Sequence, residues 1–166
     1  LLTFLLDARN WPADPASFKQ TNVYLHCLIG VILYLTINLL LRSIGYSRAP
    51  SVWIAVVATA FWLLNPYLVS TTLYIVQRMT QLAGLFMLLG ISGYLLGRTW
   101  LETRPIAGIG VMTASIGLGT ILATLSKENG ILLPPLILVL EFSLKYHWKT
   151  VGPGWQWRLA CLWLPT

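Results

Sequence analysis

The chain has 166 residues, of which 57% are hydrophobic and only 10% are charged, and its mean hydropathy is +0.73. Soluble domains carry about a quarter charged residues, so this composition excludes a soluble globular domain, and it also excludes a disordered chain and a disulfide scaffold. The net charge of +6 does not indicate nucleic acid as a partner, because the basic residues are scattered at the ends of apolar segments rather than clustered.

The apolar segments, taken in chain order, predict an integral membrane protein. Residues 1–21 include a proline-rich stretch and are predicted to form an external loop. A membrane-spanning helix needs about 20 apolar residues, whereas a barrel strand needs about ten with strict alternation. Because the apolar runs are longer and apolar all round, we predict helices at 22–41, 51–64, 80–96, 106–125 and 131–144, with a sixth beginning at Leu159.

The predicted fold is therefore all-α, a polytopic transmembrane helix bundle with five to six membrane helices. An interfacial helix is predicted within an external segment at 65–79, where Pro66 interrupts the preceding helix and polar residues alternate with aliphatic ones. Leu1 begins inside an apolar run and the segment from Leu159 stops short of a full span. We therefore expect 1–166 to be part of one transmembrane domain of a larger protein.

The positions of the basic residues predict how these helices are oriented in the membrane. Cytoplasmic connections of membrane proteins are enriched in Lys and Arg. If 22–41 runs from outside to inside, most of the 11 basic residues lie on the cytoplasmic side. The external remainder is Arg9, Lys19, Arg78 and Lys127.

Small residues at helical spacing predict where helices pack closely, since they let two backbones approach each other. We assign them a structural role and no function. The pairs are Gly93 with Gly97, Gly110 with Ala114, and Ser115 with Gly119.

The remaining polar residues give no catalytic triad, no paired carboxylates and no metal site. Cys27 and Cys161 lie in apolar surroundings without ligand spacing, so they are predicted to be buried, inert thiols. Glu141 is predicted to pair with Lys145 one turn further along a helix. His26 has two interpretations, a packed histidine bonded to a neighbouring helix or a histidine that lines a site.

Arg78 and Lys127 are the strongest functional candidates, because both lie at the predicted outer surface against the topological bias. Gln77 and Gln81 share a helix face beside Arg78, and Glu128 follows Lys127 directly. Arginine can grip phosphate oxygens with two donors and lysine adds a point charge, which indicates a phosphate site at lipid headgroup depth. The alternative is that Arg78 extends to the headgroups and that Lys127 pairs with Glu128.

The order of motifs along the chain resembles the polytopic GT-C glycosyltransferases. In particular, it is similar to protein O-mannosyltransferase-like membrane proteins that carry tetratricopeptide repeats after their membrane part. The resemblance covers roughly 14–141. The motifs that carry it are Asn22-x3-His26, Asn65-Pro66, Gln77-Arg78, Leu125-Ser126-Lys127-Glu128-Asn129 and the later Pro134.

This resemblance implies a multi-pass protein of the bacterial inner membrane, embedded in the lipid bilayer. Its donor would be a sugar on a polyprenyl phosphate or pyrophosphate on the periplasmic side, and its acceptor a protein or a glycan. Arg78 and Lys127 would contact the lipid phosphate together with Gln77, Gln81 and Glu128, while His26 and Asn65 would shape the external site. No particular cofactor is implied, and a divalent cation is left open.

The sequence also departs from the family pattern. Relatives often have His where this chain has Asn65, and an acidic residue where it has Thr80. Their catalytic acidic residue lies in the first external loop, so we expect the catalytic base to lie upstream of this sequence. Two alternatives are a non-enzymatic anchor or assembly scaffold for a soluble repeat domain and a transporter of lipid-linked glycans. Transporters place ionisable groups near the bilayer midplane, where this chain has almost none.

Overall fold

The computed structural model describes residues 15–101 and 103–147, and these residues form helices and turns without a strand among them. The predicted all-α helix bundle is therefore confirmed. In chain order the elements are α2 (Pro15–Ser43), α3 (Arg48–Leu63), η1 (Pro66–Leu68), α4 (Val69–Leu73), η2 (Ile75–Gln77), α5 (Arg78–Trp100), α6 (Pro105–Ser126), η3 (Glu128–Leu132) and α7 (Leu133–His147).

Helices α2, α5 and α6 are long enough and apolar enough to cross a membrane, which makes this chain a membrane protein. Helix α3 has 16 residues and is also apolar, and α7 has 15. At 1.5 Å per residue, these two helices are about 24 Å and about 22 Å long, which is shorter than a hydrocarbon core of about 30 Å. The helix predicted to begin at Leu159 lies outside the described residues.

Helix α2 begins earlier than the sequence pattern predicted. The expected external loop at 1–21 is wrong for 15–21, which form the first turns of α2, whereas 1–14 lie outside the described residues. Proline is favoured in the first turn of a helix, where its missing N–H has no intrahelical partner. Polar residues such as Lys19 and Gln20 made this stretch resemble a loop, yet they are exposed on a helix that extends past its apolar part.

A tight turn at Gly45 reverses the chain between α2 and α3. The backbone N–H of Tyr46 donates to the carbonyl oxygen of Leu41, and that of Gly45 donates to Arg42, both at 3.1 Å. This is the paired bonding of a Schellman motif, in which the residue after the helix adopts a left-handed conformation. Gly45 has a φ of +102°, which glycine adopts without strain.

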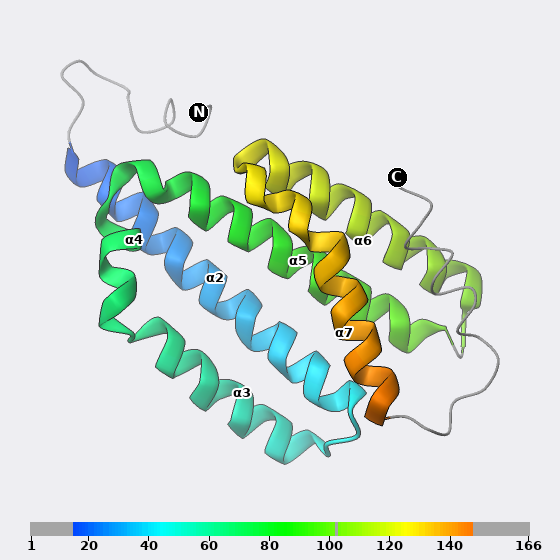
Figure 1. The fold of residues 1–166 in the computed structure, drawn as a ribbon. Helices are drawn as coiled ribbons and strands as arrows, with labels where there is room; N and C mark the ends of the chain where they lie inside the picture. The colour runs from blue at the N-terminus through cyan, green and yellow to red at the C-terminus, as the bar shows by residue number, and fades with distance from the viewer. Residues whose placement is uncertain (1–14, 102, 148–166) are drawn as a thin grey trace.

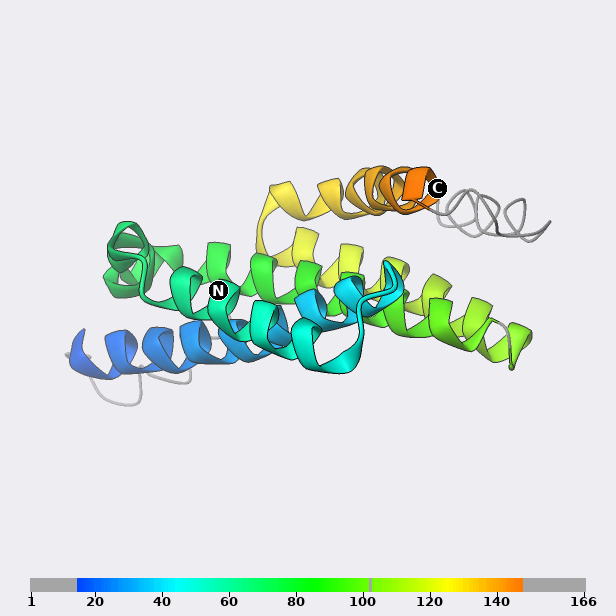
Figure 2. The same cartoon turned by 90° about the horizontal axis from the view of Figure 1, so that it is seen from below.

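Helices α3, α2, α5 and α6 lie side by side in that order, and α7 crosses α5 on one face of this layer (Figure 1). The view from below places α7 on one side of the layer formed by α5 and α6 (Figure 2). The core lies where these three helices meet, and it includes Tyr94 and Leu95 of α5, Met112 and Ile116 of α6, and Ile137 of α7.

Helices α5 and α6 pack through small residues, as predicted for Gly93, Gly97, Ser115 and Gly119. A Cβ atom on Gly97 would come within 2.8 Å of the carbonyl oxygen of Gly108, and one on Gly93 would collide with Ser115. The prediction is wrong for Gly110, which has open space where a Cβ would be and lies on the exposed face of α6 with Ala114.

A buried ion pair joins α5 to α7 near the other end of the bundle. Tyr94 donates a hydrogen bond to Oε2 of Glu141 at 2.9 Å, and Nε of Arg98 lies 3.6 Å from the same oxygen. All three side chains are buried. Glu141 thus has a buried cation beside it that can compensate its charge. The side chain of Lys145 lies outside the described part of the chain, so the pairing of Glu141 with Lys145 stays a prediction.

The prediction that Cys27 is buried is wrong, because its side chain is exposed. It lies on a face of α2 that also exposes Tyr24, Leu28 and Val31. In a membrane protein such a face contacts lipid, so apolar neighbours in the sequence do not imply burial inside the protein. Cys161 lies outside the described residues.

Candidate functional site

Arg78 and Lys127 lie at the same end of the bundle, where α5 begins and α6 ends. We call it the outer end, after the orientation that the basic residues predict, and the opposite end, with Arg42 and Arg98, the inner end. In Figure 1 the outer end is at the upper left, beside α4 and the turn from α6 to α7.

A broken helical segment connects α3 to α5 at the outer end. Oδ1 of Asn65 accepts a hydrogen bond from the backbone N–H of Tyr67 at 3.0 Å, and Pro66 begins η1. Tyr74 then leaves helical geometry with a ψ of 122°, which separates α4 from η2. The segment predicted as one interfacial helix is therefore divided into short pieces, because Pro66 and the extended Tyr74 interrupt its backbone hydrogen bonds.

Arg78 is almost completely buried, with 1% of its surface exposed. Its Nε donates to Oδ1 of Asn22 at 2.8 Å, and one Nη donates to the carbonyl oxygen of Phe18 at 3.1 Å. The guanidinium also lies 5.6 Å from the centre of the Phe18 ring, which is within the range of a cation–π contact. Arg78 therefore connects α5 to α2, and it does not extend to the membrane surface as the alternative interpretation required.

Asn22 is the residue that holds Arg78, and the sequence analysis did not identify this role. Its side chain is fully buried, and its Nδ2 donates to the carbonyl oxygen of Tyr74 at 3.2 Å. Because Oδ1 accepts from Arg78 at the same time, one amide connects α2 to both α5 and the broken segment. One sequence feature could have predicted this role: Asn22 lies in an apolar helix, and a polar side chain in a membrane span requires a bonding partner.

Lys127 is positioned by the end of α6. Its backbone is extended with a φ of −158°, and Gly130 packs so closely against α6 that a side chain there would collide with the backbone of Ala123 and Thr124. Lys127 Nζ then donates to Oγ1 of Thr80 on α5 at 3.0 Å. Lys127 thus bonds across to α5, whereas the alternative interpretation paired it with the exposed Glu128.

Thr80 ties Lys127 to the first turn of α5, the helix that Arg78 begins. It lies two residues after Arg78 in α5, and its hydroxyl donates to Oε1 of the exposed Gln77 at 3.0 Å while it accepts from Lys127. Gln81 is buried in α5, so the two amides do not flank Arg78 at the surface as predicted. We call the set Phe18, Asn22, Gln77, Arg78, Thr80 and Lys127 the outer cluster.

His26 lies one turn further into the bundle from Asn22. Its Nε2 is 3.3 Å from the carbonyl oxygen of Leu63, and its ring stacks on Trp62 with centroids 4.6 Å apart. This is the packed histidine of the first interpretation, and it fixes the end of α3 against α2. A role for His26 as a site-lining residue stays a prediction.

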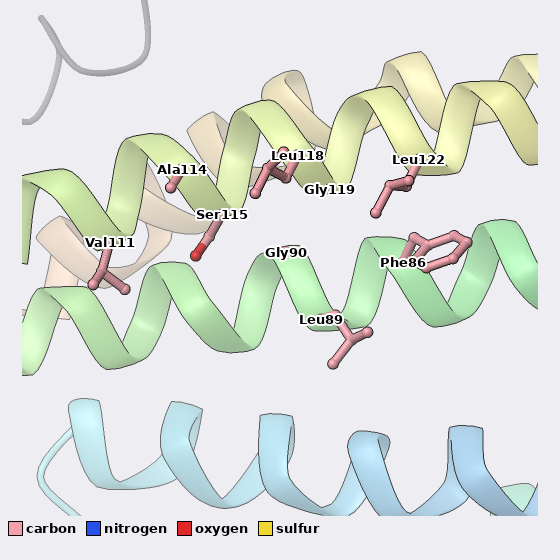
Figure 3. Close-up of a pocket in the computed structure, with 9 residues that line it drawn as sticks. All are labelled: Phe86, Leu89, Gly90, Val111, Ala114, Ser115, Leu118, Gly119 and Leu122. Atoms are coloured by element: carbon pink, nitrogen blue, oxygen red, sulfur yellow. The ribbon is translucent and has the colours of Figure 1, made fainter.

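Two surface grooves of the described residues lie apart from the outer cluster. One groove of about 290 Å³ between α5 and α6 is almost entirely apolar, with Ser115 as its polar residue (Figure 3). Another, of about 660 Å³, follows α3 and includes Asn65 among apolar side chains. Neither of these two grooves is lined by Arg78 or Lys127. Among the described residues, no three His, Cys, Asp or Glu side chains lie close enough to hold a metal ion.

The outer cluster can therefore supply positive charge and a partly exposed ammonium, but it contains no carboxylate for proton transfer. Comparisons with protein-family models, with curated proteins and with solved structures find no match to this chain.

Proposed function

We propose that this chain belongs to the transmembrane domain of a GT-C-type glycosyltransferase that takes its sugar from a polyprenyl phosphate or pyrophosphate on the periplasmic side. The observation that carries the proposal is the outer cluster, in which Lys127, bonded to Thr80, and Arg78, bonded to Asn22 and Phe18, lie at the same end of the bundle. The order of sequence motifs, which resembles that family, supports the same assignment and with it a location in the bacterial inner membrane.

Lys127 is the residue that we assign to the phosphate of the lipid donor. Its ammonium has three N–H donors, and the bond to Thr80 uses one of them. The side chain is half-buried, so its charge is only partly screened by water. The hydrogen bond to Thr80 fixes the ammonium group of Lys127, so the protein sets the direction of its other N–H donors.

Arg78 has a different role in this proposal from the one that the sequence suggested. Its bonds to Asn22 and Phe18 hold the start of α5 against α2. An arginine side chain carries a fixed positive charge, which adds to the positive potential at the end of the bundle where Lys127 lies. We therefore assign Arg78 as a positioning residue, and Gln77 as an exposed amide beside the same phosphate.

The chemistry that follows is charge stabilisation at the leaving group. When the glycosidic bond to the lipid phosphate breaks, negative charge grows on the phosphate oxygens, and a fixed cation there lowers the barrier. A carboxylate outside the outer cluster would remove the proton of the acceptor, a protein or a glycan.

The test is transfer of labelled sugar from polyprenyl-phosphate mannose and polyprenyl-phosphate glucose by membranes that contain the full chain. We expect Lys127→Ala to lower transfer by about 100-fold, as removal of a single transition-state donor does elsewhere, and Lys127→Arg to retain part of the activity. Lys19→Ala is the matched control, because Lys19 is exposed at the same end and outside the outer cluster.

Unchanged transfer by a normally inserted Lys127→Ala protein would remove the lysine from the mechanism. No transfer by the unaltered protein from either donor, with no binding of polyprenyl phosphate, would favour the anchor or scaffold alternative. Binding of the lipid with translocation and without transfer would favour the transporter. The described ionisable pair inside the bundle, Arg98 with Glu141, lies near the inner end of α5 rather than at its middle, which disfavours the transporter.

A further inference from the structure

A groove at the inner end has the features of a lipid site that the proposed function does not require. It has a volume of about 510 Å³ and lies across α2 between α3 and α5. Arg42 from the last turn of α2 and Arg48 from the first turn of α3 both line it. Two arginines therefore border one hollow at the end of the bundle.

The Schellman turn explains why these two arginines meet. Gly45 reverses the chain directly after Arg42, so that α3 starts at Arg48 beside the end of α2. The first backbone N–H groups of α3 have no intrahelical acceptor, and the side chain of the N-cap residue Ser47 does not cap them. A helix N-terminus carries a partial positive charge, which adds to that of the arginines.

The positive charge of the groove is not compensated within the described part of the chain. Arg42 and Arg48 are exposed and make no ion pair there, whereas Arg98, at the same end, is paired with Glu141. An anion from outside the protein would therefore gain the full attraction of both side chains. Guanidinium groups suit phosphate in particular, because their parallel donors match two phosphate oxygens.

The rest of the groove is suited to a hydrocarbon chain. Asn38 and Tyr34 lie one and two turns before Arg42 on α2. Most of the other residues that line the groove are apolar, among them Leu35 and Leu89. Seven residues separate Leu35 from Arg42, which corresponds to about 10 Å along the helix axis. The groove thus changes from cationic to apolar in the direction in which a lipid changes from headgroup to acyl chain.

We propose that this groove binds an anionic phospholipid of the inner leaflet, with its phosphate between Arg42 and Arg48 and the upper part of one acyl chain along Leu35 and Leu89. Basic pockets between membrane helices on the cytoplasmic side are known sites for such headgroups. The positive-inside distribution places this end at the cytoplasmic leaflet. The inference does not depend on the glycosyltransferase proposal.

The experiment is native mass spectrometry of the full chain, titrated in detergent with phosphatidylglycerol or with phosphatidylcholine of the same acyl chains. We expect phosphatidylglycerol to bind at least tenfold more tightly. Each basic residue near an anionic headgroup contributes roughly a fivefold gain in affinity, so Arg42→Gln with Arg48→Gln should weaken phosphatidylglycerol binding by about thirtyfold. Arg104→Gln is the matched control, since Arg104 is exposed at the same end and does not line the groove.

Equal affinity of the unaltered protein for the two lipids would overturn the proposal. It would also be overturned if Arg104→Gln weakened binding as much as the double variant does, because the effect would then come from net charge rather than from the groove. Displacement of the lipid by inorganic phosphate at the same concentration would assign the site to a soluble anion. If the double variant does not fold, Arg42→Lys with Arg48→Lys should keep a preference for phosphatidylglycerol that is weaker than that of the unaltered protein.

Discussion

Several buried polar side chains among the described residues are bonded to a residue of another helix, and these pairs help to determine which helices meet. Asn22 accepts from Arg78 and so joins α2 to α5, while Glu141 accepts from Tyr94 and joins α7 to α5. In lipid an unbonded polar group costs several kcal/mol, so each pair stabilises the bundle and also favours one arrangement of its helices over others. Because the polar residues are few, each one restricts the arrangement of the helices more than an apolar residue does.

The buried pair of Arg98 and Glu141 gives a prediction at the scale of single residues. Arg98→Met leaves the Glu141 carboxylate buried without its cation, and we expect this change to destabilise the protein by about 3–5 kcal/mol. Replacing the whole set, with Tyr94→Phe, Arg98→Met and Glu141→Leu, should recover most of that loss, because no buried charge then lacks a partner. Thermal unfolding in detergent measures both, and a triple variant as unstable as the single one would contradict the argument.

At the scale of elements, the bundle is held by close backbone contact between α5 and α6. Apolar side chains in lipid gain little from contact with one another, so membrane helices associate where small residues let them approach. Gly97 and Gly108 face each other in this way, and each leaves no room for a Cβ on the other. The same helices carry Gly84 and Gly110, which face open space and have no packing role.

These glycines give matched variants. We expect Gly97→Ala to lower stability by about 1–3 kcal/mol, because the new methyl group meets the backbone of α6, which cannot move aside as a flexible side chain can. Gly84→Ala should be neutral or slightly stabilising, since alanine is the better helix former. The measurement is the shift in unfolding temperature of both proteins in the same detergent. Equal shifts for the two variants would mean that α5 and α6 do not pack as described.

Apart from the start of α2 and the divided segment before α5, the helices were predictable from the sequence to within a few residues, whereas their contacts were not. The length of an apolar run gave the three long spans, and Asn65-Pro66 gave the end of α3. Hydropathy does not tell a face that contacts protein from one that contacts lipid, since both are apolar, and so Cys27 was predicted to be buried. The location of Arg78 and Lys127 at the same end of the bundle was predictable. Their partners were not predictable, because Asn22 reaches Arg78 from α2, and Thr80 reaches Lys127 from α5.

At the scale of the whole molecule, the charges and the exposed apolar surface describe a protein placed between two aqueous phases. Large side chains such as Phe61, Ile106 and Leu125 are exposed on the helices, as lipid-facing residues are. The uncompensated arginines Arg42 and Arg48 lie at one end, and the outer cluster lies at the other. Both proposals depend on which end faces the cytoplasm, so the orientation of the bundle is the property that connects them.

Labelling with a membrane-impermeant maleimide tests this orientation. In a protein with Cys27→Ser and Cys161→Ala, Ser47→Cys and Asn129→Cys each provide one exposed thiol, at the inner and the outer end respectively. Helices α3, α5 and α6 separate the two positions, so an odd number of crossings places them on opposite sides of the membrane. We expect Asn129→Cys to react in right-side-out vesicles and Ser47→Cys in inverted ones, and both to react after detergent is added. The reverse pattern would place Lys127 at the cytoplasm and remove the periplasmic donor site. Reaction of both from one side would mean that the 16 residues of α3 do not cross, since its length of about 24 Å falls short of a full span.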